Sequence, residues 1–221
     1  PEIRSKISTI ALHIESLQHP AIVSVTSSYQ SIMVAFDAKY YTYETVLNEL
    51  DLHHLNLNQE NASRSKKLIT LPVLYGGEFG PDLNIVAEHA QLTEEDVIQI
   101  HTEENYLIYA IGFLPGFPFL GGLNKIIHTP RKETPRSKIV QGSVGIANNQ
   151  TGLYPKSSPG GWQIIGRTPI DVFNLNREPM ILYEAGDYIA FKAIHQEEFT
   201  RIEDEIANGT FDYRQLVGDL K

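Results

Sequence analysis

The sequence predicts an α+β protein in which an α/β unit precedes a β-barrel. Up to residue 75, stretches with apolar residues every three or four positions alternate with short β-branched runs, as helices and strands require. From Asn105 onward, short β-branched and aromatic runs are separated by Gly/Pro-rich turns, which is typical of a closed or nearly closed barrel. A length of 221 residues, 42% of them hydrophobic, suffices for such cores.

The first unit opens with a helix, because Ile3, Ile7, Ile10 and Ile14 recur at spacings that place them on one face. Pro20 ends this segment, since proline disfavours helical geometry in the residue before it. The elements expected next are strands at 22–26 and 31–36, a helix capped by Thr42 and running to about His54, and a strand at 68–75.

The resulting order, α-β-β-α-β, lacks only the opening strand of the β-α-β-β-α-β order of a ferredoxin-like domain. We therefore assign residues 1–75 to a ferredoxin-like α/β domain with its first strand missing. We expect that strand to precede residue 1 in the full-length protein, since the sheet otherwise has an unpaired edge.

Residues 76–104 are assigned to a helical connector. Pro81 suits a first helical turn, and Thr93 with Asp96 comes near to a capping box before a second helix. His101 lies on this helix. We interpret it as a structural residue, with a role as acid or base as the alternative.

Residues 105–221 are assigned to the barrel and a C-terminal helix. The strands are expected at 106–111, 143–147, 151–154, 162–168, 180–183 and 188–193, and the helix at 195–207.

Composition excludes several classes of protein. A net charge of −9 argues against a nucleic-acid binder, which needs a basic face. The absence of cysteine excludes disulfides, thiolate nucleophiles and Cys-type zinc sites, and is compatible with the cytoplasm. No apolar run approaches the ~18 residues of a membrane helix. The chain also has no phosphate-binding P-loop, no G-x-G-x-x-G, no H-E-x-x-H and no nucleophile elbow, so no metal site or covalent catalytic residue is predicted.

Three segments carry more Gly, Pro and aromatic residues than a scaffold needs. In the first, at 112–122, Phe113 and Phe117 lie on a Gly/Pro loop that either plugs a barrel end or forms a pocket wall. In the second, at 129–136, Arg131 and Arg136 lie on proline-stiffened turns and offer rigid forks of donors for a carboxylate or phosphate. Ordinary surface arginines are the alternative.

The third segment, at 142–162, combines glycines that permit close backbone approach with hydrogen-bonding side chains. Its binding candidates are Gln150, Thr151, Tyr154 and Ser158. Trp162 is the only tryptophan and is interpreted as either a core residue or a pocket wall.

These segments resemble the family that comprises the B subunit of 5-oxoprolinase, KipI and allophanate hydrolase subunit 1. The matching text is YGGEFGPDL at 75–83, AEHAQLTEEDVIQIH at 87–101, GFLPGFPFLGGL at 112–123, TPRKETPR at 129–136, GSVGIANNQTGLYP at 142–155 and SPGGWQIIGRTP at 158–169. The motifs occur in a fixed order and span most of residues 68–195.

The resemblance implies a cyclophilin-like barrel after the ferredoxin-like domain. It also implies one subunit of a cytoplasmic hydrolase that uses ATP to open 5-oxo-L-proline to L-glutamate, acting together with the A and C subunits and inactive alone. No covalent cofactor is implied. In this reading Arg131 and Arg136 bind a carboxylate or phosphate, the polar side chains at 150, 151 and 154 orient the lactam, and the Phe113/Phe117 loop excludes water.

Other functions remain open at this stage. KipI is an inhibitor of a sporulation histidine kinase, so a kinase is an alternative partner. The same domain pair occurs in urea carboxylase, which makes an accessory unit of urea carboxylase or allophanate hydrolase a second alternative. A prolyl isomerase is suggested by the barrel alone, and analogy of fold is a weak argument. The sequence leaves homo-oligomerisation and the location of the ATP site open.

Overall fold

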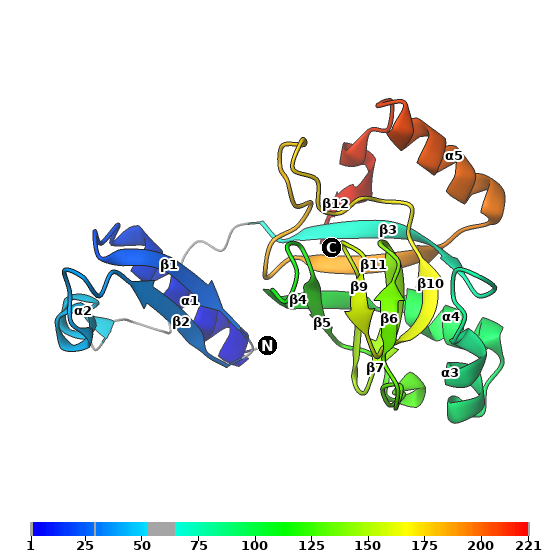
Figure 1. The fold of residues 1–221 in the computed structure, drawn as a ribbon, viewed down its shortest axis with the longest axis horizontal. Helices are drawn as coiled ribbons and strands as arrows, with labels where there is room; N and C mark the ends of the chain where they lie inside the picture. The colour runs from blue at the N-terminus through cyan, green and yellow to red at the C-terminus, as the bar shows by residue number, and fades with distance from the viewer. Residues whose placement is uncertain (1, 29, 53–64, 221) are drawn as a thin grey trace. The chain divides into compact units, whose positions relative to one another are not determined.

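A computed structural model describes residues 2–28, 30–52 and 65–220 (Figure 1). The chain forms two compact units, Pro1–Arg64 and Ser65–Lys221, and each is described by itself.

The first unit confirms the predicted α-β-β-α order. Helix α1 (Glu2–Ser16) is followed by strands β1 (Ile22–Ser27) and β2 (Ile32–Phe36) and by helix α2 (Tyr43–Glu49). The strands pair antiparallel, and Ile14, Ala21, Val46 and Leu50 form a small buried core. Thr42 is the N-cap of α2, as expected, and accepts from the Thr45 amide at 3.2 Å. The helix ends at Glu49, earlier than predicted, and His54 lies outside the described residues.

The strand expected at 68–75 forms, but in the second unit, so our domain boundary at residue 75 is wrong. Strand β3 (Lys67–Tyr75) pairs parallel with β11 (Tyr188–Ala193) and belongs to the eight-stranded sheet of that unit. Its side chains at Ile69, Leu71 and Val73 are completely buried. These alternate residues share one face of the strand, which packs in the main hydrophobic core of this unit.

The opening strand expected before residue 1 stays a prediction. Among the described residues, β2 has no strand on its second edge. Beside it lies an apolar groove of about 410 Å³ between α1, β2 and α2, lined among others by Ile10, Val34 and Leu47.

The second unit is the predicted closed barrel (Figure 1). Its other strands are β4 (Asn105–Ile111), β5 (Pro118–Gly121), β7 (Ser143–Ala147), β8 (Gln150–Leu153) and β10 (Gln163–Arg167). They follow the order β10-β7-β8-β5-β4-β11-β3, and the pairing of Gly166 with Tyr75 joins β10 to β3 and closes the ring. Strand β12 (Val217–Asp219) adds to the other end of β3.

The helices predicted for the connector and the C-terminal segment are confirmed. The connector contains α3 (Leu83–Ala90) and α4 (Glu94–Glu103), and the capping box of Thr93 with Asp96 is present. Helix α5 (Gln196–Ala207) packs on β3 through a face that includes Phe199 and Ile202. Short 3₁₀ turns lie at η2 (Lys125–Ile127) and η3 (Tyr213–Leu216).

Two short strands outside the ring, β6 (Arg136–Ile139) and β9 (Ser158–Gly160), pair with each other. The sequence did not predict them, because each is only three or four residues long and rich in Ser, Pro, Gly or charge. The strand expected at 180–183 is wrong. That segment is a loop with a single bridge between Phe173 and Ile181.

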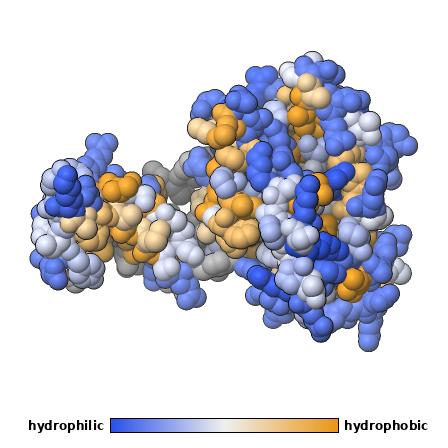
Figure 2. Space-filling model, in the orientation of Figure 1, coloured by the Kyte–Doolittle hydropathy of each residue, from blue (hydrophilic) through white to orange (hydrophobic). Residues whose placement is uncertain are grey.

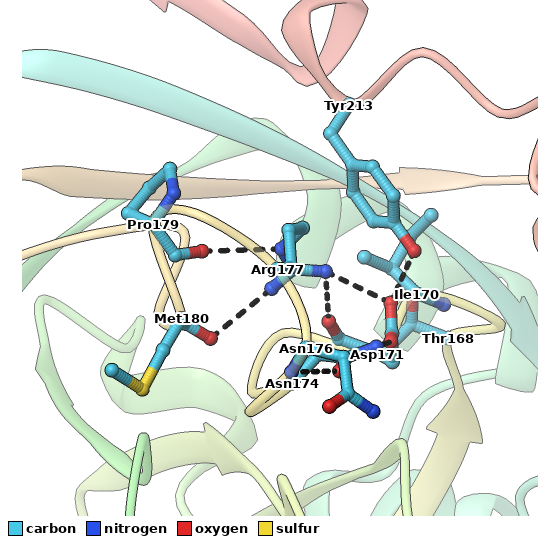
Figure 3. A network of polar contacts seen from close by, with 9 residues as sticks. All are labelled: Thr168, Ile170, Asp171, Asn174, Asn176, Arg177, Pro179, Met180 and Tyr213. Atoms are coloured by element: carbon cyan, nitrogen blue, oxygen red, sulfur yellow. Dashed lines mark hydrogen bonds and ion pairs between the residues drawn. The ribbon is translucent and has the colours of Figure 1, made fainter.

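Backbone bonds from the Asn174 amide to the Met180 carbonyl and from the Leu182 amide to the Val172 carbonyl join the two arms of this loop, and side-chain hydrogen bonds add to them (Figure 3). Arg177 donates from Nη1 to the Asp171 carbonyl at 2.7 Å, from Nε to the Pro179 carbonyl at 3.2 Å and from Nη2 to the Met180 carbonyl at 3.3 Å. Its guanidinium also lies 4.3 Å from the centre of the Tyr213 ring. Every nitrogen of the Arg177 guanidinium has an acceptor, so this network fastens the loop rather than offering donors to a ligand.

Candidate functional site

An aromatic cluster on one face of β7, β8 and β10 is the best candidate for a site. Phe117, Tyr154 and Trp162 meet edge to face, with ring centres 5.4 to 6.3 Å apart. The cluster is separate from the main core. Neighbours along the chain, such as Leu153 and Tyr154, belong to different clusters because successive residues of an extended chain point to opposite faces.

Gly152 makes room for the indole of Trp162, and Gly145 permits close approach of the Gln163 carbonyl, whose oxygen a Cβ at 145 would meet at 2.8 Å. Gly145 and Gly152 are paired across β7 and β8. A Cβ at 152 would lie 3.2 Å from the Trp162 ring, and one at 145 would lie 3.4 Å from the Trp162 Cβ. These two glycines therefore serve close packing on the barrel wall.

The segment of residues 129–136, called the strap below, is hydrogen-bonded onto this face. The Asn148 amide donates to the Thr129 carbonyl at 2.7 Å, and the Lys132 amide donates to the Gly161 carbonyl at 2.8 Å. The side-chain amide of Gln163 donates to the Pro130 carbonyl at 3.0 Å. The guanidinium of Arg131, between these anchors, lies 6.0 Å from the centre of the Trp162 ring, within cation–π range.

A buried carboxylate, Asp82, meets the other two cations of the strap. Arg136 Nη2 donates to its Oδ1 at 2.7 Å, Lys132 Nζ donates to the same oxygen at 3.3 Å, and the Ile164 amide donates to Oδ2 at 2.7 Å. Burial acts to raise the pKa of Asp82, but the Arg136 and Ile164 hydrogen bonds and the two positive charges outweigh it. The pKa therefore lies below its usual 3.8, and the group is ionised at neutral pH.

Tyr154 contributes a neutral phenol next to the strap. Burial raises the pKa of Tyr154 to about 12, although the nearby positive charge of Arg131 acts in the opposite direction. At pH 7 the hydroxyl therefore keeps its proton and acts as a hydrogen-bond donor or acceptor rather than as a base.

The structure brings together four of the residues that the sequence singled out: Arg131, Tyr154, Trp162 and Phe117. Trp162 and Phe117 are almost completely buried and form the floor rather than an open wall. Phe113 is 68% exposed, at a backbone φ of +67°, and meets the floor at the edge of Phe117, with ring centres 5.6 Å apart.

Other candidates take different places. Arg136 is committed to Asp82, so the expectation that it offers a free fork to a ligand is not supported. Ser158 lies on β9, where its hydroxyl donates to the Pro159 carbonyl at 3.3 Å. Gln150 begins β8 opposite Ala147.

His101 and Thr151 lie in the barrel interior and not at the cluster. Thr151 donates to the Gly145 carbonyl at 3.1 Å, so it accepts from His101 Nε2 at 2.8 Å, and His101 Nδ1 accepts from the Tyr75 hydroxyl at 2.8 Å. Burial lowers the pKa of His101 to about 3. The imidazole is neutral and fully enclosed, which supports the structural interpretation and leaves no route for proton exchange with a ligand.

Sequence reasoning missed Asp82 and Lys132. Asp82 follows Pro81 and stands at the N-cap of α3, where the ordinary expectation is helix capping. The three cations within six residues of the strap could have indicated a carboxylate partner, because partly buried positive charges require a negative charge nearby.

Within residues 2–28, 30–52 and 65–220, no group of three or more His, Asp or Glu side chains is arranged to hold a metal ion. The helices of the same ranges are all too short or too polar to cross a membrane.

Comparisons with known proteins place the chain. The model of the carboxyltransferase domain, subdomain C and D, matches residues 1–183. The chain is 39% identical over 215 residues to the B subunit of 5-oxoprolinase from Bacillus subtilis, covering 92% of this chain and 89% of that protein. It is 53% identical over 123 residues to the corresponding protein of Haemophilus influenzae, covering 56% and 58%. Urea amidolyase of Lachancea kluyveri is 24% identical over 222 residues, which cover 86% of this chain and 12% of that protein.

Solved structures agree. The conserved uncharacterized protein PH0987 from Pyrococcus horikoshii is 43% identical, with a TM-score of 0.59 and 90% of both chains covered. TTHA0988 is 30% identical, with a TM-score of 0.76 over 88% of this chain, which spans only 37% of that larger chain. On this evidence the chain belongs to the family of the 5-oxoprolinase B subunit, whose shared element is the carboxyltransferase domain of subdomains C and D.

Proposed function

We propose that this chain is one subunit of an ATP-dependent 5-oxoprolinase that opens 5-oxo-L-proline to L-glutamate together with the A and C subunits. The names of the bacterial relatives described above support this proposal, and the word subunit in those names implies a multisubunit assembly. We expect the assembly to act in the cytoplasm and the isolated chain to be inactive.

The observation that carries the proposal is the pairing of Arg131 with the Tyr154–Trp162 floor. Arg131 forms no ion pair with the described carboxylates, so its guanidinium is available for the carboxylate of 5-oxoproline. The floor beneath Arg131 is buried, with Tyr154 2% and Trp162 5% exposed, so it supports the guanidinium, and the exposed Arg131 is the group that would meet the substrate. In this arrangement the chain binds and orients the substrate rather than breaking its bond.

ATP fits this site poorly. A triphosphate carries several negative charges, whereas Asp82 already neutralises part of the charge of Lys132 and Arg136. A single available guanidinium matches one carboxylate better than a nucleotide tail. We therefore assign no step of ATP chemistry to this chain. In the assembly, phosphorylation of the lactam oxygen by ATP would make the lactam carbon electrophilic. Water would then add to that carbon, the ring C–N bond would break, and a second water would release phosphate to give glutamate.

The test is ATP-dependent release of glutamate by the purified assembly of all three subunits. Arg131→Ala is expected to lower kcat/KM at least about tenfold, because a charge-assisted hydrogen bond contributes about 1.5–3 kcal/mol. Arg214→Ala is the matched control, since this arginine is 91% exposed and pairs with its neighbour Asp212. Equal turnover of the two variants and the wild type would remove Arg131 from substrate binding.

Urea is the second candidate substrate, favoured by the sequence match to urea amidolyase. The same assembly assayed with urea and bicarbonate in place of 5-oxoproline separates the two candidate substrates, because only one of them should support ATP hydrolysis.

Inhibition of a histidine kinase is the remaining alternative. It predicts capture of a kinase and no stimulation of ATP hydrolysis by 5-oxoproline.

A further inference from the structure

The Asp82 carboxylate has hydrogen-bond partners that are unusual for a residue at the start of a helix. Asp82 is the N-cap residue of α3, and N-cap aspartates ordinarily accept from the amides of their own helix. The Asp82 side chain makes no such bond. Its two oxygens accept instead from Ile164 on β10 and from Arg136 and Lys132 of the strap. The carboxylate thus joins a helix end, a barrel strand and the strap.

The burial of this group makes its contacts matter. The Asp82 side chain is 2% exposed, while Arg136 and Lys132 are 28% and 25% exposed. A buried carboxylate that loses its cations is strongly disfavoured, whereas the two cations are partly hydrated and depend on the pairing less. Arg136 depends on it further, because its Nη1 is buried without a hydrogen-bond partner in the described structure. Asp82 is therefore the sole carboxylate that compensates this guanidinium among the described residues.

The consequence for the strap follows from the spacing of its cations. Arg131 lies next to Lys132, whose amide is bound to Gly161 and whose ammonium is bound to Asp82. Arg136, at the far end, is bound to the same oxygen. One carboxylate thus holds the strap at two points beyond Arg131, whose own guanidinium extends to the Trp162 ring.

We propose that Asp82 is a positioning residue that acts through Lys132 and Arg136 to hold the strap against Trp162 and to aim Arg131. Its importance for substrate binding rests on the proposed function, whereas its hold on the strap does not. Asp82 also sets the charge of the site. Its single negative charge offsets one of the three positive charges of the strap and occupies donors of Lys132 and Arg136, so Arg131 is the strap cation without an ion pair to a described carboxylate.

Trp162 is the only tryptophan of the chain and provides a direct probe. It is 5% exposed beneath the strap, so acrylamide should quench its fluorescence weakly in the wild-type chain. Asp82→Asn keeps the shape and removes the charge. It is expected to raise the quenching constant at least about twofold, because local opening exposes the indole. Asp212→Asn, the same change in an exposed ion pair, should leave quenching at the wild-type value.

Arg136→Gln and Lys132→Gln keep the test valid if Asp82→Asn does not fold, since both side chains are partly exposed and lie on the strap. Each should increase quenching, with Arg136→Gln having the larger effect because its hydrogen bond is shorter. Asp82→Glu, which keeps the charge, should restore part of the protection. Wild-type quenching in the folded members of this series would overturn the proposal.

The KM for 5-oxoproline in the assembled complex separates this proposal from the proposed function. Asp82→Asn is expected to raise KM in proportion to the loss of protection of Trp162, with kcat nearly unchanged. Increased quenching with wild-type KM would support the strap mechanism and count against the assigned substrate site. A loss of turnover in Arg131→Ala with unaltered quenching in Asp82→Asn would support the site and overturn the role of Asp82.

Discussion

Protonation of His101 should control the acid stability of the barrel. The imidazole is completely buried, and burial lowers its pKa to about 3 from 6.5. Between these values the unfolded chain binds one proton more than the folded chain. Stability therefore falls as the pH drops from 6.5 towards 3 and is fully retained above 6.5.

The magnitude follows from the proton difference. From pH 6 to pH 4 the unfolded imidazole becomes almost fully protonated while the folded one does not, so this residue alone should cost about 2.5 kcal/mol of unfolding free energy. In His101→Phe this dependence disappears. The substitution also leaves the Tyr75 hydroxyl without its partner, which lowers stability by about 1–3 kcal/mol at every pH.

The assay is urea unfolding at pH 4, 5 and 6, followed by Trp162 fluorescence. The wild-type free energy should decline more steeply than that of His101→Phe, with the two curves converging at acid pH. His89→Ala, at an exposed site on α3, should track the wild type. Parallel curves for the wild type and His101→Phe would refute the assignment of a neutral, enclosed imidazole. Loss of turnover in His101→Phe with unchanged pH dependence would favour the acid–base role instead.

Two further predictions concern packing. Gly152→Ala should lower the unfolding free energy by about 1–3 kcal/mol, because its Cβ meets both the Trp162 ring and the Pro118 carbonyl at 3.2 Å, and the emission of Trp162 should shift in parallel. Arg177→Ala should cost about 2–3 kcal/mol in urea unfolding, because it removes the part-buried hydrogen bonds to the Asp171 carbonyl and carboxylate (Figure 3), whereas Arg201→Ala on the surface of α5 should cost less than about 0.5 kcal/mol.

The apolar residues outside the main core are of three kinds: single exposed side chains, an apolar groove in the first unit, and the covered aromatic cluster of the candidate site. The hydropathy of the exposed surface is mixed, with orange patches among blue side chains (Figure 2). Single exposed apolar residues include Phe113, Leu175 and Met180. The groove between α1, β2 and α2 is an apolar hollow of about 410 Å³. The candidate site, by contrast, is an aromatic floor already covered by the strap.

Local patterns were sufficient for most helices and strands. The spacing of Ile residues predicted α1, the Thr93–Asp96 pair predicted the start of α4, and the Gly/Pro-punctuated runs predicted most barrel strands. The same patterns failed where structure rests on side-chain contacts. The loop at 170–181 looked like a strand at its end because Ile181 and Leu182 are apolar, yet Arg177 holds it through carbonyls that any sequence offers.

Strand propensity and side-chain charge are properties of individual residues. The sequence was therefore sufficient to predict strand β3 and to identify the three cations of the strap. The pairing of β3 with β11, and the choice of Arg136 rather than Arg131 as the partner of Asp82, could not be predicted from it. Hydrogen-bond partners and counter-ions come from distant parts of the chain and meet only in the folded molecule. Which donors remain for a ligand therefore depends on the tertiary fold, because each buried charge must first find its own compensation.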